Sequence, residues 1–524
     1  MTQVPSILAC LTLATILLSL IGEPLRLVLT RKLQLFSQLD VLQSFILNVY
    51  LGGFVLHAIA VIPVGLYKPP TIYLLIAASG LAIVMAKWRE ITSLPKLRPK
   101  MTQPQHLGTI PILLTLAMSA IVVTIHIMAE FGFLFGNVHD LSLHSLLVKV
   151  IIENGYVPET LQPYEATGII YPQGFHVIVV FYAYLLKVPP AEITFLVMPV
   201  FQGLVVLGAY FLGKSLSNRR EVGALLAFAF TFISRWPKLL LWGSNAYVAG
   251  FPFYLVLLGM LPLISRCNTV YSSPLRYGKG IWQTAFMGLL IGYLGAIHVI
   301  IYEVFMITLF LAVAWKIAST RQLNIRVKNL GLLSLFSSLP ILVYLYRFVS
   351  FYPLPGHNVG IPSDAIESVQ SSLAQTLEEF RWGFITSDWL SPYEPMRLEL
   401  LILIASGVIF AIWIRNRDSF TMIRELVWVS ALSQIGAIVL MLLSSRETGI
   451  PLLSHVVVWE VGFIIYVSAI IFVGSFYASL LHFIRGPLIR TIRSRFVAIA
   501  VAGIVLLSIN AAPIYFTFAG DLQY

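Results

Sequence analysis

Charged residues and cysteines are scarce in this chain of 524 residues. Asp, Glu, Lys and Arg together make up only 11% of the sequence, whereas 58% of the residues are hydrophobic. A soluble globular protein cannot bury that much apolar surface, so the composition excludes that class. The only two cysteines, Cys10 and Cys267, lie in an apolar run and in a basic loop, which excludes a disulfide framework.

Motifs for nucleotide and zinc chemistry are missing as well. The chain contains no P-loop, no zinc-ligand spacing, no dinucleotide fingerprint and no internal repeat. The formal net charge of +11 would by itself suggest nucleic acid as a partner. Because the basic residues are spread over many short loops between apolar runs, we interpret the excess as membrane sidedness and expect no nucleic-acid partner.

Apolar runs long enough to cross a membrane recur along the whole chain. A hydrocarbon core of about 30 Å needs roughly 20 apolar residues in a helix. The sequence therefore predicts an all-α polytopic membrane protein with about 14 transmembrane helices, a multi-pass protein of the cell membrane. The predicted spans are 5–22, 42–66, 71–86, 110–128, 193–212, 222–240, 248–265, 282–297, 299–316, 329–348, 398–414, 425–443, 455–482 and 496–516.

Residues 175–186, with the sequence FHVIVVFYAYLL, are apolar but too few to cross. Twelve helical residues rise only about 18 Å. We expect this segment to lie in the membrane interface, or to dip into the membrane and return to the same side.

With that segment not crossing, most Lys and Arg residues fall in loops on one side, which the positive-inside rule assigns to the cytoplasm. The predicted cytoplasmic loops are 23–40, 87–109, 213–221, 266–281, 316–328, 415–424 and 483–495. Most acidic residues then lie outside, where two long segments, 129–192 and 349–397, are also placed. The histidines on this outer side are His126, His139, His144, His176, His298, His357 and His455.

The first long outer segment contains the stretch HDLSLHSLLVKVIIENG, residues 139–155. Its apolar residues recur at steps of three and four, which predicts an amphipathic helix lying on the membrane and ending near Gly155. Asp140 and His144 are one turn apart and share a face. Asp140 is suited to accept a proton or bind a metal with His139 or His144 beside it, but it is equally a residue type that caps helix N-termini.

Residues 108–320 resemble the GT-C superfamily of polyprenyl-phosphate-sugar-dependent glycosyltransferases. The resemblance lies in the order of a span, an outer loop with an acidic residue on a juxtamembrane helix, YPQG at 171–174, a short apolar segment and a span ending in KSLSNRR. It implies transfer of a sugar from a polyprenyl-phosphate lipid donor to an acceptor on the extracytoplasmic face. Membrane lipid and the lipid donor would be the partners.

The resemblance also implies a division of the chain and a set of catalytic residues. Residues 1–107 would be an N-terminal three-helix addition with a basic linker, 108–348 the GT-C-like catalytic module, and 349–524 C-terminal helices with the long outer loop 349–397. Asp140 would be the catalytic base or a metal ligand. The class often has a second acidic residue where this chain has Asn245, which weakens a metal-dependent reading but leaves a divalent cation open as a cofactor.

The remaining candidate residues would bind substrate. Trp242 and Asn245 are suited to stack on a sugar and to hydrogen bond with it, although Trp242 also fits an interfacial aromatic belt. His298 and Glu303 lie at an outer turn, where Glu303 is either functional or a structural partner of a nearby residue. The class places a basic residue on the lipid phosphate, a role for which the candidates are Arg347 and, preferably, Arg446.

Two other functions share these features. A multi-pass transporter or lipid flippase would also need outer polar residues, although transporters typically repeat their halves and place charge at the midplane, and this chain does neither. A polysaccharide polymerase or ligase would use the same location and the same kind of lipid donor. The sequence does not separate that function from glycosyl transfer, and it leaves the oligomeric state open.

We expect positions 140 and 446 to lie on the same outer side, because the basic loops place both segments there. Asp140→Cys and Arg446→Cys, each in a chain whose two cysteines are replaced by serine, should react with a membrane-impermeant maleimide added to intact cells. Lys214→Cys, in a predicted inner loop, should react only after permeabilisation. Reaction of positions 140 and 446 from opposite sides would contradict this topology.

Overall fold

The computed structural model of the chain describes most of its first two thirds. The described residues are 4–33, 38–93, 109–130, 139–164, 171–233, 245–267, 274–320, 323–351 and 421–443, with single residues at 36, at 169 and between 461 and 478. All regular structure in these ranges is helical, and no strand occurs among them. The all-α class predicted from the sequence is therefore confirmed for this part of the chain.

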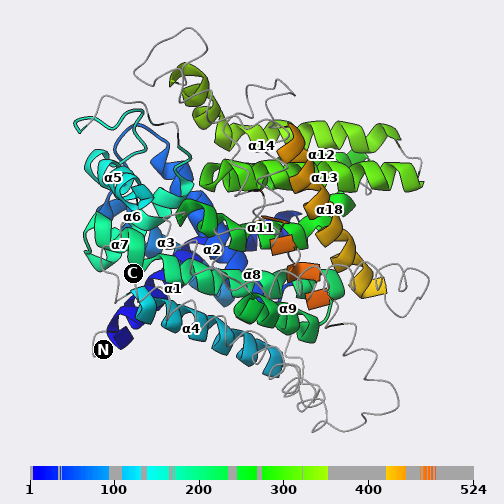
Figure 1. Cartoon of the computed structure of the whole chain (residues 1–524), viewed down its shortest axis with the longest axis horizontal. Coiled ribbons are helices and arrows are strands. Elements are labelled where there is room, and N and C mark those ends of the chain that lie inside the picture. Colours follow the sequence, from blue (N-terminus) through cyan, green and yellow to red (C-terminus); the bar gives the residue numbers. More distant parts are fainter. Residues whose placement is uncertain are drawn as a thin grey trace, which may run out of the picture. The chain divides into compact units, whose positions relative to one another are not determined.

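The helices follow the apolar runs of the sequence (Figure 1). Their bounds are α1 (Val4–Leu33), α2 (Val41–Ala60), α3 (Pro69–Ser93), α4 (Ile110–Glu130), α5 (His139–Asn154), α6 (Gly174–Leu186), α7 (Pro190–Leu196), α8 (Met198–Ser217), α9 (Arg220–Ile233), α11 (Asn245–Cys267), α12 (Pro274–Ile297), α13 (Val299–Thr320), α14 (Leu323–Phe351) and α18 (Thr421–Leu443).

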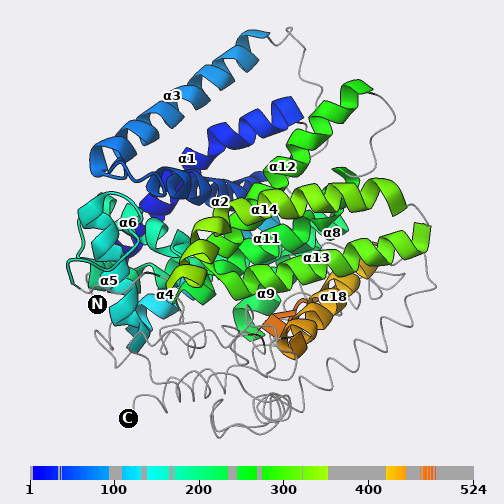
Figure 2. The same ribbon diagram turned by 90° about the horizontal axis from the view of Figure 1, so that it is seen from above.

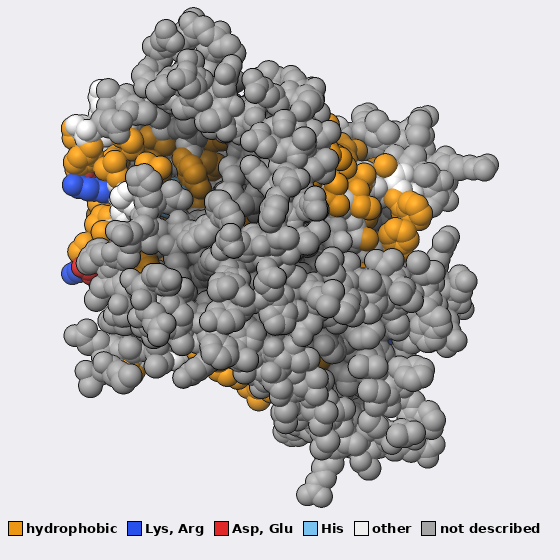
Figure 3. Space-filling model, in the orientation of Figure 1, with side chains coloured by type: hydrophobic (Ala, Val, Ile, Leu, Met, Phe, Trp, Pro, Cys, Tyr) orange, Lys and Arg blue, Asp and Glu red, His pale blue; other side chains and the backbone are white. Residues whose placement is uncertain are grey.

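Seven helical stretches are long and apolar enough to cross a membrane, as a multi-pass membrane protein requires. They are Pro5–Lys32, Val41–Ala60, Pro69–Trp88, Ile110–Ile127, Pro190–Ser217, Gly280–Ile297 and Glu425–Leu443. Each overlaps a predicted span. The predicted spans 398–414 and 496–516 and most of 455–482 lie outside the described residues, so the total of about 14 stays a prediction. On the face drawn in Figure 3, hydrophobic side chains dominate the described surface.

The described helices divide into two compact units. Unit 1 contains α1 to α7, most of α8, and α11, α12 and α14, whereas unit 2 contains the end of α8, α9, almost all of α13, and α18. Unit 2 is held in part by Trp315 of α13, which packs on Trp428 of α18 with ring centroids 4.8 Å apart. The division into 1–107, 108–348 and 349–524 stays a prediction.

An aromatic core joins early and late helices within unit 1. Tyr50 of α2 stacks on Phe253 of α11 at 4.7 Å and donates its hydroxyl hydrogen to the Leu290 carbonyl of α12. Tyr293 of α12 packs against both Tyr50 and His57. Helices from the predicted N-terminal addition and from the predicted catalytic module thus share one core.

Helices α1 and α2 approach until their backbones touch. A Cβ atom at Gly22 would lie 2.0 Å from the Asn48 carbonyl oxygen, and one at Gly52 would lie 2.1 Å from the Leu18 carbonyl oxygen. Small residues permit such approaches between membrane helices, where lipid supplies no hydrophobic force to press the helices together. Figure 2 shows α1 and α2 side by side, with α3 flanking α1.

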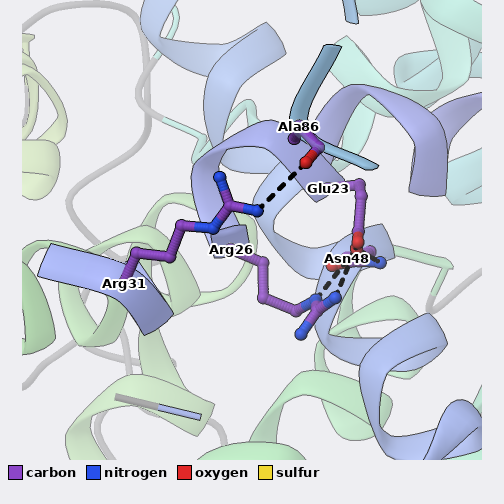
Figure 4. Close-up of polar contacts among 5 residues, drawn as sticks. All are labelled: Glu23, Arg26, Arg31, Asn48 and Ala86. Carbon is purple, nitrogen blue, oxygen red and sulfur yellow. Dashed lines mark hydrogen bonds and ion pairs between the residues drawn. The ribbon is translucent and has the colours of Figure 1, made fainter. Parts of the chain in front are cut away.

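A polar cluster lies beside this crossing (Figure 4). Arg26 donates two hydrogen bonds to the Glu23 carboxylate, at 2.9 and 2.6 Å, and Asn48 of α2 donates a third at 2.6 Å. Arg31 donates to the Ala86 carbonyl oxygen at 3.4 Å. Residues 23–33, predicted as part of a loop, instead continue α1, because Glu23 and Arg26 neutralise each other within the helix.

Gly52→Ala should lower the free energy of unfolding by about 1–3 kcal/mol, because the new methyl group would overlap the Leu18 carbonyl oxygen and push α1 from α2. Gly80→Ala in α3 is the matched control, since no atom lies within 4 Å of its Cβ position. That change should leave the stability unchanged or raise it. Thermal unfolding in detergent measures both, and equal melting temperatures for the two variants would contradict the described crossing.

Candidate functional site

Helix α5 forms where the sequence predicts it, from His139 to Asn154. It ends at Gly155, whose φ of +69° suits glycine and stops the helix. The turn is fastened to the loop between α2 and α3, because the Tyr67 amide donates to the Gly155 carbonyl at 2.7 Å and the Val157 amide donates to the Ala60 carbonyl at 2.8 Å.

The apolar face of α5 packs on the protein itself. Leu147 and Val150 are buried in a cluster with Leu161 and Ile169. Figure 1 shows α5 beside α6 and α7, and these three helices are in contact. The sequence predicted that this face would lie on the membrane, whereas the structure covers most of it with neighbouring helices and leaves Leu143 exposed.

Helix α6 has 13 residues, as the length of its apolar run predicted. It ends at Lys187, which adopts the left-handed conformation with φ of 55°, and Pro189 follows. At its start, a Cβ atom at Gly174 would lie 2.8 Å from the Ala296 carbonyl oxygen of α12. The glycine of YPQG is therefore required for close contact between the start of α6 and the end of α12.

Two buried histidines join α5 to α6. The Nδ1 atom of His144 and the Nε2 atom of His176 are 2.8 Å apart and form a hydrogen bond. His144 is 4% exposed and His176 is fully buried. Since one ring nitrogen must donate and the other accept, the bond requires that at least one of the two imidazoles be neutral.

Aromatic rings enclose this pair and connect it to a third histidine. Tyr171 contacts His144 and His176 edge-on, with centroids 5.3 and 5.8 Å apart. Tyr171 also contacts His298, which follows the end of α12, at 6.4 Å. His298 in turn contacts Tyr247 in the first turn of α11, at 5.0 Å. We call His144, Tyr171, His176, Tyr247 and His298 the histidine–tyrosine cluster.

The histidine–tyrosine cluster gathers helix ends that are far apart in the sequence. It joins the first turns of α6 and α11, the second turn of α5 and the C-terminal end of α12. Helix N-termini carry partial positive charge and unpaired amide hydrogens, so the first turns of α6 and α11 favour an anionic ligand there.

Burial disfavours the charged form of the His176 imidazole. The pKa of His176 lies well below its ordinary value of 6.5, mainly because burial disfavours the charged ring and secondly because His144 is close.

Gln173, which precedes α6, is also buried. Among the described residues, neither polar atom of its side chain has a hydrogen-bond partner.

The structure brings several predicted site residues to the histidine–tyrosine cluster. His144 and His298 belong to it, His139 and Asp140 form the first turn of α5, and Asn245 is the first residue of α11. The side chains of His139, Asp140 and Asn245 lie outside the described residues.

Of the other candidates, the structure describes only the side chain of Glu303. Arg347 is in the last turns of α14, but its side chain lies outside the described residues, as do Trp242 and Arg446 altogether. Glu303 is partly buried in α13 and belongs to unit 2. Among the described side chains, no group of three or more His, Cys, Asp or Glu residues is placed to hold a metal ion.

Sequence reasoning did not assign Tyr171, His176 or Tyr247 to a site. His176 was counted among the outer histidines, and YPQG was noted as a motif, so the signal was present at positions 171–176. Tyr247 gave no signal, because its role depends only on where α11 begins. No protein-family model matches this chain, and no curated protein is significantly similar to it.

Lowering the pH should weaken the docking of α5. An unfolded histidine takes up a proton near pH 6.5 and buried His176 does not, so the unfolded state binds more protons below that pH. The contribution of His176 to the free energy of unfolding is complete above about pH 6.5. It declines as the pH falls toward the lower pKa that His176 has in the folded protein. Between pH 7.5 and 5.0 the melting temperature should fall by about 2 °C or more from this source.

The double variant His144→Asn/His176→Gln isolates this effect. The two amides place nitrogen or oxygen near the positions of Nδ1 and Nε2, and neither takes up a proton. Its melting temperature should therefore depend less on pH than that of the unaltered protein. Equal pH dependence in the two proteins would rule out a contribution from the histidine pair.

Proposed function

We propose that this protein is a glycosyltransferase of the cell membrane that moves a sugar from a polyprenyl-phosphate donor to an acceptor on the extracytoplasmic face. The proposal joins the resemblance of residues 108–320 to the GT-C superfamily with one structural observation. The first turns of α6 and α11 and the second turn of α5 meet around the histidine–tyrosine cluster; Asp140 lies one turn before His144 on α5, and Asn245 is the first residue of α11.

This arrangement suits a lipid-linked sugar phosphate. The phosphate is anionic, and converging helix N-termini stabilise an anion through their dipoles and amide hydrogens. The sugar is polar and requires hydrogen-bonding and stacking groups, for which Trp242, Asn245 and His298 are the candidates. The donor's polyprenyl chain would remain among the apolar helices of unit 1.

The proposed reaction is a single displacement at the anomeric carbon of the sugar. The acceptor hydroxyl oxygen forms a bond to that carbon as its proton passes to the Asp140 carboxylate. The bond from the carbon to the phosphate oxygen breaks, and the phosphate leaves with the electron pair. Arg446 or Arg347 would stabilise the charge on the leaving phosphate.

The proposed reaction uses no metal ion, because Asn245 stands where a second carboxylate is common in the class. Neutral Asn245 would instead hydrogen bond with the sugar, and Glu303 stays a proposed contact of the substrate.

Asp140→Asn should abolish transfer while the protein remains folded. Asparagine caps a helix N-terminus about as well as aspartate, so the change removes the base and keeps the cap. Loss of a general base lowers kcat by about 10²–10⁴-fold. The measurement is release of polyprenyl phosphate and formation of glycosylated product from a fluorescent polyprenyl-phosphate sugar by the purified protein.

Glu153→Gln is the matched control, because Glu153 is a carboxylate at the other end of α5 that accepts a hydrogen bond from Tyr164. It should retain activity within about threefold. Accumulation of substrate in vesicles without bond cleavage would replace the proposal with a transporter or flippase. Transfer by Asp140→Asn at the unaltered rate would show that Asp140 is only a helix cap.

A further inference from the structure

We propose that His176 is a positioning residue that sets the place of Asp140 by holding the start of α5 through its hydrogen bond to His144. This inference rests on the proposed function, because it takes Asp140 as the base. In this inference His144 forms a structural bond between two helices. His176, which belongs to α6, then determines the geometry of the first turn of α5, which carries Asp140.

The contacts along α5 show why this one bond matters. Ser142 and Leu143 are exposed, and His144 is the first buried side chain after Asp140 among the described residues of α5. The apolar anchors, Leu147 and Val150, lie about one and two turns further along. Among the described residues of α5, the buried side chain nearest after Asp140 is therefore His144, one helical turn away, and its bond to His176 joins α5 to α6.

A hydrogen bond controls this turn more tightly than apolar packing would. Apolar contacts have no preferred direction, whereas the bond between Nδ1 of His144 and Nε2 of His176 fixes both separation and rotation of α5. The rings themselves are held edge-on by Tyr171 and by Phe175, which lies 5.8 Å from His144 and 5.2 Å from His176.

His176 is a suitable anchor because its own helix cannot shift easily. It is the third residue of α6, and Gly174 brings that end of α6 against the Ala296 carbonyl of α12. Further along α6, the Val177 carbonyl accepts a hydrogen bond from the Tyr67 hydroxyl at 2.7 Å. Through the bond to His176, the position of α5 therefore depends on the contacts that α6 makes with α12 and with the loop after α2.

The expected effect is on turnover more than on binding. A displacement of about 1 Å between a catalytic group and its substrate lowers the rate about 100-fold. Donor binding depends on other residues, so KM should change little. A general loss of folded protein would also lower the apparent kcat at unchanged KM, so kcat is calculated per molecule of folded protein.

The experiment compares three variants of the full-length purified protein. His176→Phe keeps an aromatic ring and removes the bond. His144→Asn/His176→Gln restores a bond between the same positions with two amides. His57→Phe is the matched control, because His57 is a buried histidine of α2 in the same unit whose ring packs on Tyr293 of α12.

A second measurement reports on α5 without using activity. The Ser145 hydroxyl is buried beside His144, so the thiol introduced by Ser145→Cys is shielded while α5 is docked. With Cys10 and Cys267 replaced by serine, the rate of alkylation by N-ethylmaleimide measures how often α5 opens. We expect His176→Phe to raise this rate at least tenfold, whereas the double variant and His57→Phe leave it within about twofold.

Support consists of faster alkylation in His176→Phe together with a kcat lowered about 100-fold at a KM within about threefold, both restored by the double variant. Unchanged alkylation in His176→Phe overturns the proposal, and so does faster alkylation with unchanged kcat. If the unaltered protein transfers no sugar, the proposed function fails, and the alkylation rates still decide whether the histidine pair holds α5. If His176→Phe does not fold, the double variant decides, since fast alkylation with unchanged kcat there, or slow alkylation with a kcat lowered about 100-fold, overturns the proposal.

Discussion

Backbone amides and carbonyls inside a lipid bilayer must find their hydrogen-bond partners within the protein, and the described structure depends on that requirement. Its described regular elements are accordingly helices alone. Since lipid does not press helices together, close packing has to come from shape, as at Gly22 and Gly52. The charge of the Glu23 carboxylate is tolerated in helix α1 because Arg26 and Asn48 donate hydrogen bonds to it.

The same requirement explains why the polar chemistry gathers at helix ends. Apolar helices leave little room for imidazole and hydroxyl groups along their lengths, whereas their ends carry unpaired backbone groups and positive or negative dipole ends. The histidine–tyrosine cluster lies where the starts of α6 and α11 and the second turn of α5 meet the end of α12. Its buried rings pack edge-on against one another, and His144 and His176 form a hydrogen bond between two of the helices.

Under the proposed function, activity and folding are coupled at the histidine pair. The hydrogen bond that docks α5 on α6 lies one helical turn after Asp140, on the same helix. Helix α6, with 13 residues, contacts both α5 and α12, so that a shift of one can be transmitted to the other. The proposal thereby places its base on a docked helix.

The sequence by itself determined the all-α class, the span-length apolar helices, the bounds of α5 near 139 and 155, and the short α6. These features follow from the periodicity of apolar residues, from the length of apolar runs and from the glycine that ends a helix. All of these are visible within a single segment of the sequence. Only the tertiary structure decided that His144 bonds to His176, that α5 buries its apolar face in the protein, and that Tyr247 reaches His298. Those facts depend on how helices distant in the chain approach one another, and the side-chain shapes that set such approaches leave no periodic mark in the sequence.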